Sequence, residues 1–193
     1  MMRAPTIDPA DAAAAAARFA ATAPADVAYT VHDSPVGRLV LAATPRGLVR
    51  IAYELPNGGL DSVLQALADR LSPRVLEAPA RLDPARRELE EYFEGRRTAF
   101  DLPVDLALAA PFGKRVLAAT AAIPFGETRT YAQVAALAGT PTGARATGNA
   151  LGANPVPIVI PCHRVTRSGG GLGGYTGGLD IKRRLLAIEG RSR

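Results

Sequence analysis

Residues 154–165 read NPVPIVIPCHRV, and this stretch holds the single cysteine of the chain, Cys162, directly before one of its two histidines, His163. Residues 154–161 contain three prolines, which disfavour a helix, so we predict a rigid connector that holds the thiol in place. A thiol reacts as its thiolate and, with a pKa near ~8.5, needs a base or a positive environment at neutral pH. His163 is a candidate base. On these residues alone, a small buried cysteine is the alternative to a nucleophile.

The composition indicates a globular protein with one domain or two small ones, because 48% of its 193 residues are apolar and 21% are charged. A single cysteine excludes an internal disulfide and a C-x-x-C zinc site, and it indicates a reducing, cytoplasmic compartment. Residues 111–193 hold eleven Lys and Arg against three Asp and Glu, net +8, while residues 1–110 are net −3. A basic half is typical of a nucleic-acid-binding surface, although a solvated cationic face has the same charge.

Residues 1–26 are expected to form an alanine- and proline-rich extension without an assigned function. Six consecutive alanines occupy residues 12–17, and acidic residues lie where a secretion signal would be positive. No stretch approaches the ~20 apolar residues of a membrane span, so we expect no membrane association.

The following residues predict an α+β domain over residues 27–105. Three short strand-like segments are separated by turns rich in Pro and Gly, which indicates a three-stranded antiparallel sheet. Two segments with apolar residues at helical spacing follow, and residues 102–109 are expected to be a linker or extended arm. His32 is isolated in a strand and is assigned a structural role. The predicted strands are 27–32, 38–43 and 48–53, and the predicted helices are 59–71 and 83–95.

Residues 106–193 predict a mostly helical domain with a helix-turn-helix. A helix over 111–122 precedes two short helices, 131–138 and 144–152, which are joined by a glycine-containing turn. The second of the two carries only one charge, Arg145, among small residues. Small side chains cannot read base edges, so we predict shape-based binding in a minor groove, with Arg145 projecting into the base stack.

Residues 168–178 form a glycine-rich loop that formally contains G-x-G-x-x-G. No βαβ pattern surrounds it and no acidic residue follows at the required distance, so we reject a dinucleotide site. We expect instead a backbone that passes close to another surface. A closing helix over 179–189 is predicted to turn residues 182–184 outward and to bring the Glu189 carboxylate back to the cysteine loop.

The motifs together closely resemble the O6-alkylguanine-DNA alkyltransferases. These motifs are Pro-Cys-His-Arg-Val at 161–165, the preceding Asn-Pro-x-Pro, the Gly-Tyr-Thr-Gly-Gly that follows, and the closing Glu189-Gly190. The likeness runs from about Val27 to Gly190 and is nearly continuous in the second half. Leu117 stands where most relatives have tryptophan, and the chain has no tryptophan at all; we expect local rearrangement of the core without a change in chemistry.

The resemblance implies a winged helix-turn-helix-like second domain and repair of DNA by direct reversal. Such proteins flip O6-alkylguanine out of the duplex and transfer its alkyl group irreversibly to the cysteine, here Cys162, in a single turnover. His163 would take the thiol proton through a water, and Glu189 would orient the imidazole. Tyr131 would donate to guanine N3 as charge develops. Neither a metal nor an organic cofactor is implied.

The resemblance also assigns the remaining site residues. Arg145 would fill the space left by the flipped nucleotide, and Asn154 would brace the connector. The other DNA-binding and pocket or supporting residues are Thr130, Ala144, Gly148, Pro157, Val165, Tyr175, Thr176 and Gly177.

The implied partner is double-stranded DNA containing O6-alkylguanine. We expect a monomer, since a protein that acts at isolated lesions has no evident need of a partner subunit. Two other functions are considered. A non-catalytic alkylated-DNA-binding module is disfavoured because it would lack Cys162. A DNA-binding regulator is disfavoured because the chain has no cysteine-rich zinc module and no base-reading side chains on its second short helix.

Overall fold

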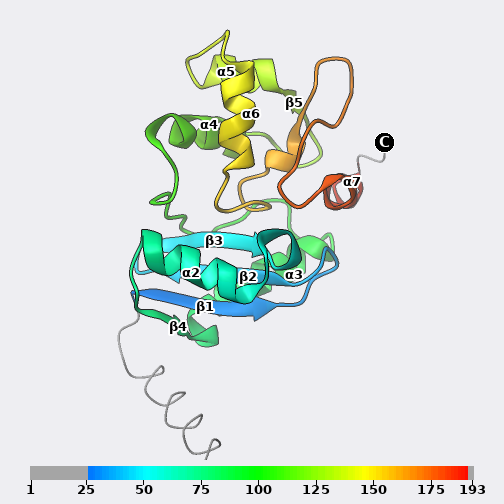
Figure 1. Cartoon of the computed structure of the whole chain (residues 1–193). Coiled ribbons are helices and arrows are strands. Elements are labelled where there is room, and N and C mark those ends of the chain that lie inside the picture. Colours follow the sequence, from blue (N-terminus) through cyan, green and yellow to red (C-terminus); the bar gives the residue numbers. More distant parts are fainter. Residues whose placement is uncertain (1–25, 191–193) are drawn as a thin grey trace, which may run out of the picture.

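The computed structural model describes residues 26–190, so all but the last residue of the predicted N-terminal extension, residues 1–26, lies outside the described part. A sheet with two helices forms one portion, and four helices with the glycine-rich loop form the other (Figure 1). We call them the sheet portion, β1 to α3, and the helical portion, α4 to α7. The predicted α+β class is confirmed. Among residues 26–190, no helix has the length and apolar character needed to span a membrane.

The sheet contains one strand more than the sequence predicts. β1 (Val27–His32), β2 (Leu39–Thr44) and β3 (Gly47–Tyr53) pair antiparallel as expected. A fourth strand, β4 (Val75–Glu77), pairs parallel with β1 and gives the order β3-β2-β1-β4. The prediction of three antiparallel strands is wrong on this point, because three residues are too few to show an alternating pattern and a parallel partner is distant in sequence.

Different elements pack on the two faces of the sheet. α2 (Leu60–Arg70) packs Val63 and Leu67 on the face that bears Val40 and Ala42. The opposite face packs against α3 (Asp83–Phe93) and also against apolar residues of the helical portion. Two short 3-10 helices, η1 (Leu55–Asn57) and η2 (Pro79–Leu82), complete the sheet portion. The residues of this second cluster that come from the helical portion are Val156, Ile158 and Leu185.

Part of the chain between α3 and α4 is extended, and Val104 forms an isolated parallel bridge with Leu48 of β3. Leu48 N–H donates to Pro103 O at 2.8 Å, and Asp105 N–H donates to Leu48 O at 2.9 Å. The Asp105 carboxylate accepts from Thr44 Oγ1 at 2.6 Å and pairs with Arg46 at 3.0 Å. The expected linker is therefore an arm fastened to the sheet by both backbone and side chain.

The helical portion follows the predicted order to within two residues at each helix end. Thr130 caps α5 by accepting from Gln133 N at 3.2 Å, while Gln133 Oε1 accepts from Thr130 N at 2.7 Å. Two short parallel strands, β5 (Arg129–Thr130) and β6 (Val165–Thr166), join the start of α5 to the residues after Cys162. The helices are α4 (Pro111–Ala121), α5 (Tyr131–Leu137), α6 (Ala144–Gly152), η3 (Cys162–Arg164) and α7 (Leu179–Ile188).

Candidate active site

Asn154 fastens the connector that carries the thiol. Its Nδ2 donates to Ile160 O at 2.9 Å and to Cys162 Sγ at 3.3 Å, and its Oδ1 accepts from Val156 N at 3.0 Å. Between these contacts, the buried Ile158 has a φ of 76°, a strained value for a β-branched residue. One amide side chain and the prolines thus fix the loop, as the sequence predicts for a rigid connector.

The Cys162 thiol lies in an environment of opposing influences. The residue is 5% exposed, and burial raises the pKa of its thiol. The amide of Asn154 and the ammonium of Lys182 act in the opposite direction, because both favour the thiolate. The thiol therefore has local stabilisation for its anion but needs a base to remove its proton.

Lys182 points inward, and the expectation that it faces solvent is wrong. Its side chain crosses the core from α7, and Nζ donates to Val165 O at 2.5 Å, Leu172 O at 2.5 Å and Gly174 O at 3.4 Å. Burial lowers the pKa of Lys182 to about 8. The long apolar stem of lysine permits this, since only its head needs polar partners. Lys182 ties the glycine-rich loop to the segment after Cys162.

His163 and Glu189 form a buried pair behind the cysteine. His163 Nε2 lies 2.8 Å from Glu189 Oε1, and because a carboxylate only accepts, Nε2 carries the proton. His163 Nδ1 is buried and has no hydrogen-bond partner within residues 26–190. Burial lowers the pKa of His163 below its ordinary value, because its effect outweighs the opposing effect of Glu189. A neutral imidazole with Nδ1 free is suited to act as a base.

Three further groups hold Glu189. Arg164 donates from Nε to Oε2 and from Nη2 to Oε1, both at 2.9 Å. Tyr92 Oη donates to Oε1 at 2.8 Å, and Gly126 N–H donates to Oε2 at 3.2 Å. Burial alone would raise the pKa of Glu189, but His163 and Arg164 hold it at about 2. The carboxylate is therefore charged and held in one orientation.

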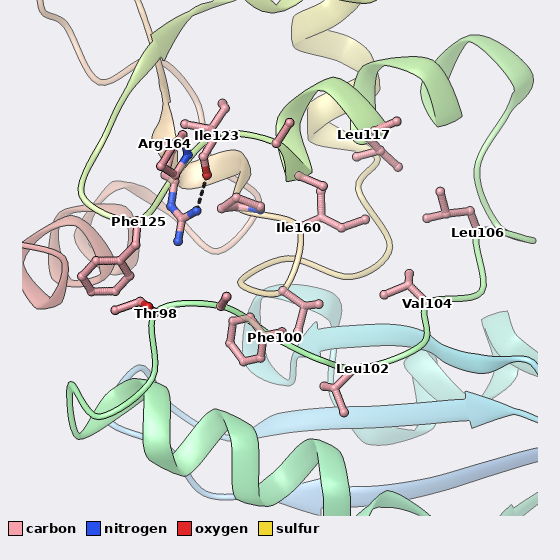
Figure 2. A pocket seen from close by; sticks show the side chains of 17 residues that line it. Thr98, Phe100, Leu102, Val104, Leu106, Leu117, Ile123, Phe125, Ile160 and Arg164 are labelled. Atoms are coloured by element: carbon pink, nitrogen blue, oxygen red, sulfur yellow. Dashed lines mark hydrogen bonds between the residues drawn. The ribbon is translucent and has the colours of Figure 1, made fainter.

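Arg164, Tyr92 and Lys182 also belong to this site, although the sequence did not predict them. Arg164 lies within the cysteine motif, which was a usable signal. Figure 2 shows its guanidinium reaching the carbonyl of Ile123, to which Nη1 donates at 2.5 Å. Tyr92 belongs to the sheet portion, and no local pattern connects it to the cysteine.

A cavity of about 500 Å³ opens beside Cys162, between α5, α6 and the glycine-rich loop. Its volume lies in the range of small-molecule sites. The predicted residues that line it are Cys162, Tyr131, Ala144, Arg145, Gly148, Tyr175 and Thr176. Four further lining residues were not predicted from the sequence, which are Leu151, Gly152, Arg167 and Gly174.

The glycine-rich loop packs closely on tyrosine rings. At Gly173, with a φ of 72°, an added Cβ would lie 2.5 Å from Tyr131 Oη, so only glycine fits. Tyr131 Oη donates weakly to Gly174 O at 3.5 Å. Tyr175 and Tyr53 share a hydrogen bond of 2.7 Å between their hydroxyls. The backbone of the glycine-rich loop thus passes close to the Tyr131 ring, which lines the cavity.

Several predicted residues lie near the cavity without lining it. The Thr130 side chain caps α5, and the buried Pro157 lies inside the connector. Val165 donates its N–H to Cys162 O and accepts from Lys182 at its carbonyl. A Cβ at Gly177 would meet the Tyr53 ring at 2.7 Å. Thr176, which does line the cavity, donates from Oγ1 to Gly152 O at 3.0 Å.

A second and larger cavity, of about 800 Å³, lies between the extended arm and α4 (Figure 2). Its walls are mostly apolar, and Leu117, Phe100 and Phe125 are among them, with Arg164 as the charged residue. Cys162 does not line it. Within residues 26–190, no cluster of three or more His, Cys, Asp or Glu side chains could hold a metal ion.

Two family models match the chain in succession. Residues 27–106 match the model described as 6-O-methylguanine DNA methyltransferase, ribonuclease-like domain, and residues 111–191 match the one described as 6-O-methylguanine DNA methyltransferase, DNA binding domain. The chain belongs to the 6-O-methylguanine DNA methyltransferase family. The resemblance inferred from the motifs around Cys162 is confirmed.

Relatives in the family match over nearly their whole length. The methylated-DNA--protein-cysteine methyltransferase of Mycolicibacterium paratuberculosis is 40% identical over 170 residues, covering 86% of this chain and 93% of that relative. The protein of the same name from Methanosarcina barkeri is 38% identical, covering 83% and 96%.

Solved structures agree. The crystal structure of Mycobacterium tuberculosis O6-methylguanine methyltransferase matches with a TM-score of 0.74 and 36% identity, covering 86% of this chain and 95% of that one. A crystal structure of Mycobacterium tuberculosis OGT in complex with DNA also matches with a TM-score of 0.74, at 37% identity, covering 86% and 94%.

Proposed function

We propose that this chain repairs DNA by transferring the alkyl group of O6-alkylguanine to Cys162, as a methylated-DNA--protein-cysteine methyltransferase. The observation that carries the proposal is the position of the thiol. Cys162 lies in the wall of a cavity that α6 borders, and His163, the next residue of η3, forms a buried pair with Glu189. The cavity would hold the flipped base with its O6 substituent facing the sulfur.

The reaction follows from these groups. The thiol proton passes to His163 Nδ1 through a water, and the imidazolium that forms is stabilised by Glu189 across the 2.8 Å hydrogen bond. The thiolate sulfur attacks the alkyl carbon, so that an S–C bond forms while the C–O6 bond breaks. The electron pair of the broken bond remains on guanine, where Tyr131 donates a hydrogen bond to N3. The thioether has no return path to a thiol, so each molecule acts once.

Double-stranded DNA binds along α6. Arg145 is exposed on this helix and lines the cavity, while the small Ala144 and Gly148 permit close approach to a groove. Arg145 would fill the space left by the flipped nucleotide. Thr130, at the start of α5, would contribute to the same surface.

The chain works as a monomer, since one copy holds both the thiol and its base. It acts in the cytoplasm, because the thiol must stay reduced. Residues 27–105 and 106–193 are its two domains, with Asn154, Pro157, Val165 and Gly177 supporting the cavity that Tyr175 and Thr176 line.

The test is incubation with a duplex oligonucleotide that contains one O6-methylguanine, followed by intact-protein mass spectrometry and peptide mapping. A methyl group on Cys162, absent in Cys162→Ser and absent with unmodified DNA, is the expected result. Binding of the damaged duplex without any added mass would indicate the non-catalytic module. Strong preference for one undamaged sequence would indicate the regulator.

A further inference from the structure

Tyr92 belongs to the sheet portion and contacts the buried pair of His163 and Glu189. It lies near the end of α3 and is fully buried. Its Oη lies 2.8 Å from Glu189 Oε1 and 3.4 Å from His163 Nε2. The reaction described above uses the carboxylate and the imidazole but gives this hydroxyl no part.

Three aromatic rings surround the Tyr92 ring. The ring centroids of Phe93, Phe100 and Phe125 lie 5.5, 5.4 and 6.2 Å from that of Tyr92. Such tilted and edge-on contacts fix the direction in which the hydroxyl points. Burial, followed by the charge of Glu189, raises the pKa of Tyr92 far above its ordinary value, so the hydroxyl stays protonated. It is therefore a permanent donor at a fixed position.

The acceptor of this hydroxyl is the oxygen that also orients His163. Glu189 Oε1 receives Tyr92 Oη at 2.8 Å, His163 Nε2 at 2.8 Å and Arg164 Nη2 at 2.9 Å. Three donors on one oxygen leave the carboxylate a single orientation. They also divide its negative charge, so that each donor receives a smaller share of it.

We propose that Tyr92 is a positioning residue for the alkyl transfer, which fixes Glu189 Oε1 so that His163 keeps its proton on Nε2 and presents Nδ1 toward the thiol. The sheet portion thereby completes the active site. This inference rests on the proposed function, because it assigns Tyr92 a part in that reaction.

The inference predicts a change in the pH dependence of the reaction. The titratable and charged groups around His163 are Glu189 and Lys182 from α7 and its end, Arg164 and Cys162 from η3, Tyr92 from α3 and Tyr175 from the glycine-rich loop. Loss of the Tyr92 hydroxyl leaves more of the Glu189 charge for the imidazolium, so the pKa of His163 rises. His163 is then protonated at a higher pH, and the acidic limb of the pH–rate profile moves to higher pH.

The experiment compares Tyr92→Phe with Tyr29→Phe in single-turnover reactions on the O6-methylguanine duplex, from mildly acidic to alkaline pH. Phenylalanine keeps the ring packing of Tyr92, and Tyr29 is a half-buried tyrosine of β1, which also belongs to the sheet portion. We expect Tyr92→Phe to react ~10-fold more slowly at neutral pH, the effect of losing one hydrogen bond. We also expect its acidic limb at higher pH and unchanged behaviour of Tyr29→Phe.

Two results would overturn the inference while the wild-type protein still reacts: an unchanged rate and profile, or a loss by the same factor at every pH. Absence of methyl transfer in the wild-type protein would instead contradict the proposed function. Should Tyr92→Phe not fold, ¹⁵N NMR of the wild-type imidazoles decides, with His32→Gln assigning the other histidine. A proton on His163 Nε2 and a slowly exchanging tyrosine hydroxyl proton close to it are expected. A proton on Nδ1, or no such hydroxyl, would refute the inference.

Discussion

Replacement of Glu189 by glutamine should remove a pH-dependent part of the stability of this protein. Glu189 is 4% exposed, and the donors around it hold its pKa at about 2 instead of the ordinary 4.5. One pKa unit is worth about 1.4 kcal/mol, so the ionised carboxylate contributes ~3 kcal/mol to the free energy of unfolding at neutral pH. The order of magnitude follows from the two pKa values alone.

The pH dependence of this contribution follows from the lowered pKa of Glu189 in the folded protein. The pKa is lower in the folded state, so the contribution is complete above the unfolded value near 4.5 and is lost as the pH falls toward 2. About 2 of the ~3 kcal/mol should be lost by about pH 3. The difference in stability between the wild-type protein and Glu189→Gln should therefore shrink over this window, because glutamine does not titrate.

The assay is urea unfolding of both proteins at a series of pH values, with Glu127→Gln as control. Glu127 forms an exposed ion pair with Arg129, and such pairs contribute little. Other carboxylates titrate in both proteins, so the difference isolates Glu189. A difference between the wild-type protein and Glu189→Gln that stays constant from pH 6 to about pH 3 would refute the reasoning from linked proton binding.

Two further changes test other parts of the site. Lys182→Met removes the ammonium that lowers the pKa of the Cys162 thiol; we expect slower reaction with iodoacetamide at neutral pH and a rate profile displaced to higher pH, and an unchanged profile would contradict this electrostatic role. Leu117→Trp should extend into the 800 Å³ cavity and stabilise the fold by ~1 kcal/mol, raising Tm by a few degrees. Its indole would be the sole tryptophan, so solvent-like emission with a lowered Tm would show that the cavity does not accept it.

The parts of the fold that local patterns determine could be predicted from the sequence. Turns with Pro and Gly delimit β1 to β3, and apolar spacing delimits the helices, because these signals act over a few residues. β4 was missed, since its pairing with β1 depends on the chain returning across α2. Lys182 was misplaced because helical spacing cannot tell a buried lysine head from a solvated one.

Some residues of the site could likewise be predicted from the sequence, and others could not. Cys162 and His163 are adjacent in the sequence, and the cysteine motif identifies them. Glu189 was recognised through its place in the closing motif. Tyr92 reaches the same carboxylate across the contact between the two portions, and nothing in the residues around it distinguishes it from an ordinary core tyrosine. Only the packed structure brings it to the active site.

The mass of the intact protein after incubation with excess O6-methylguanine duplex tests alkyl transfer to Cys162 directly. We expect one added methyl group per molecule, located on Cys162, with no further reaction when fresh duplex is supplied. Continued demethylation by the same molecules, or transfer that persists in Cys162→Ser, would contradict this expectation.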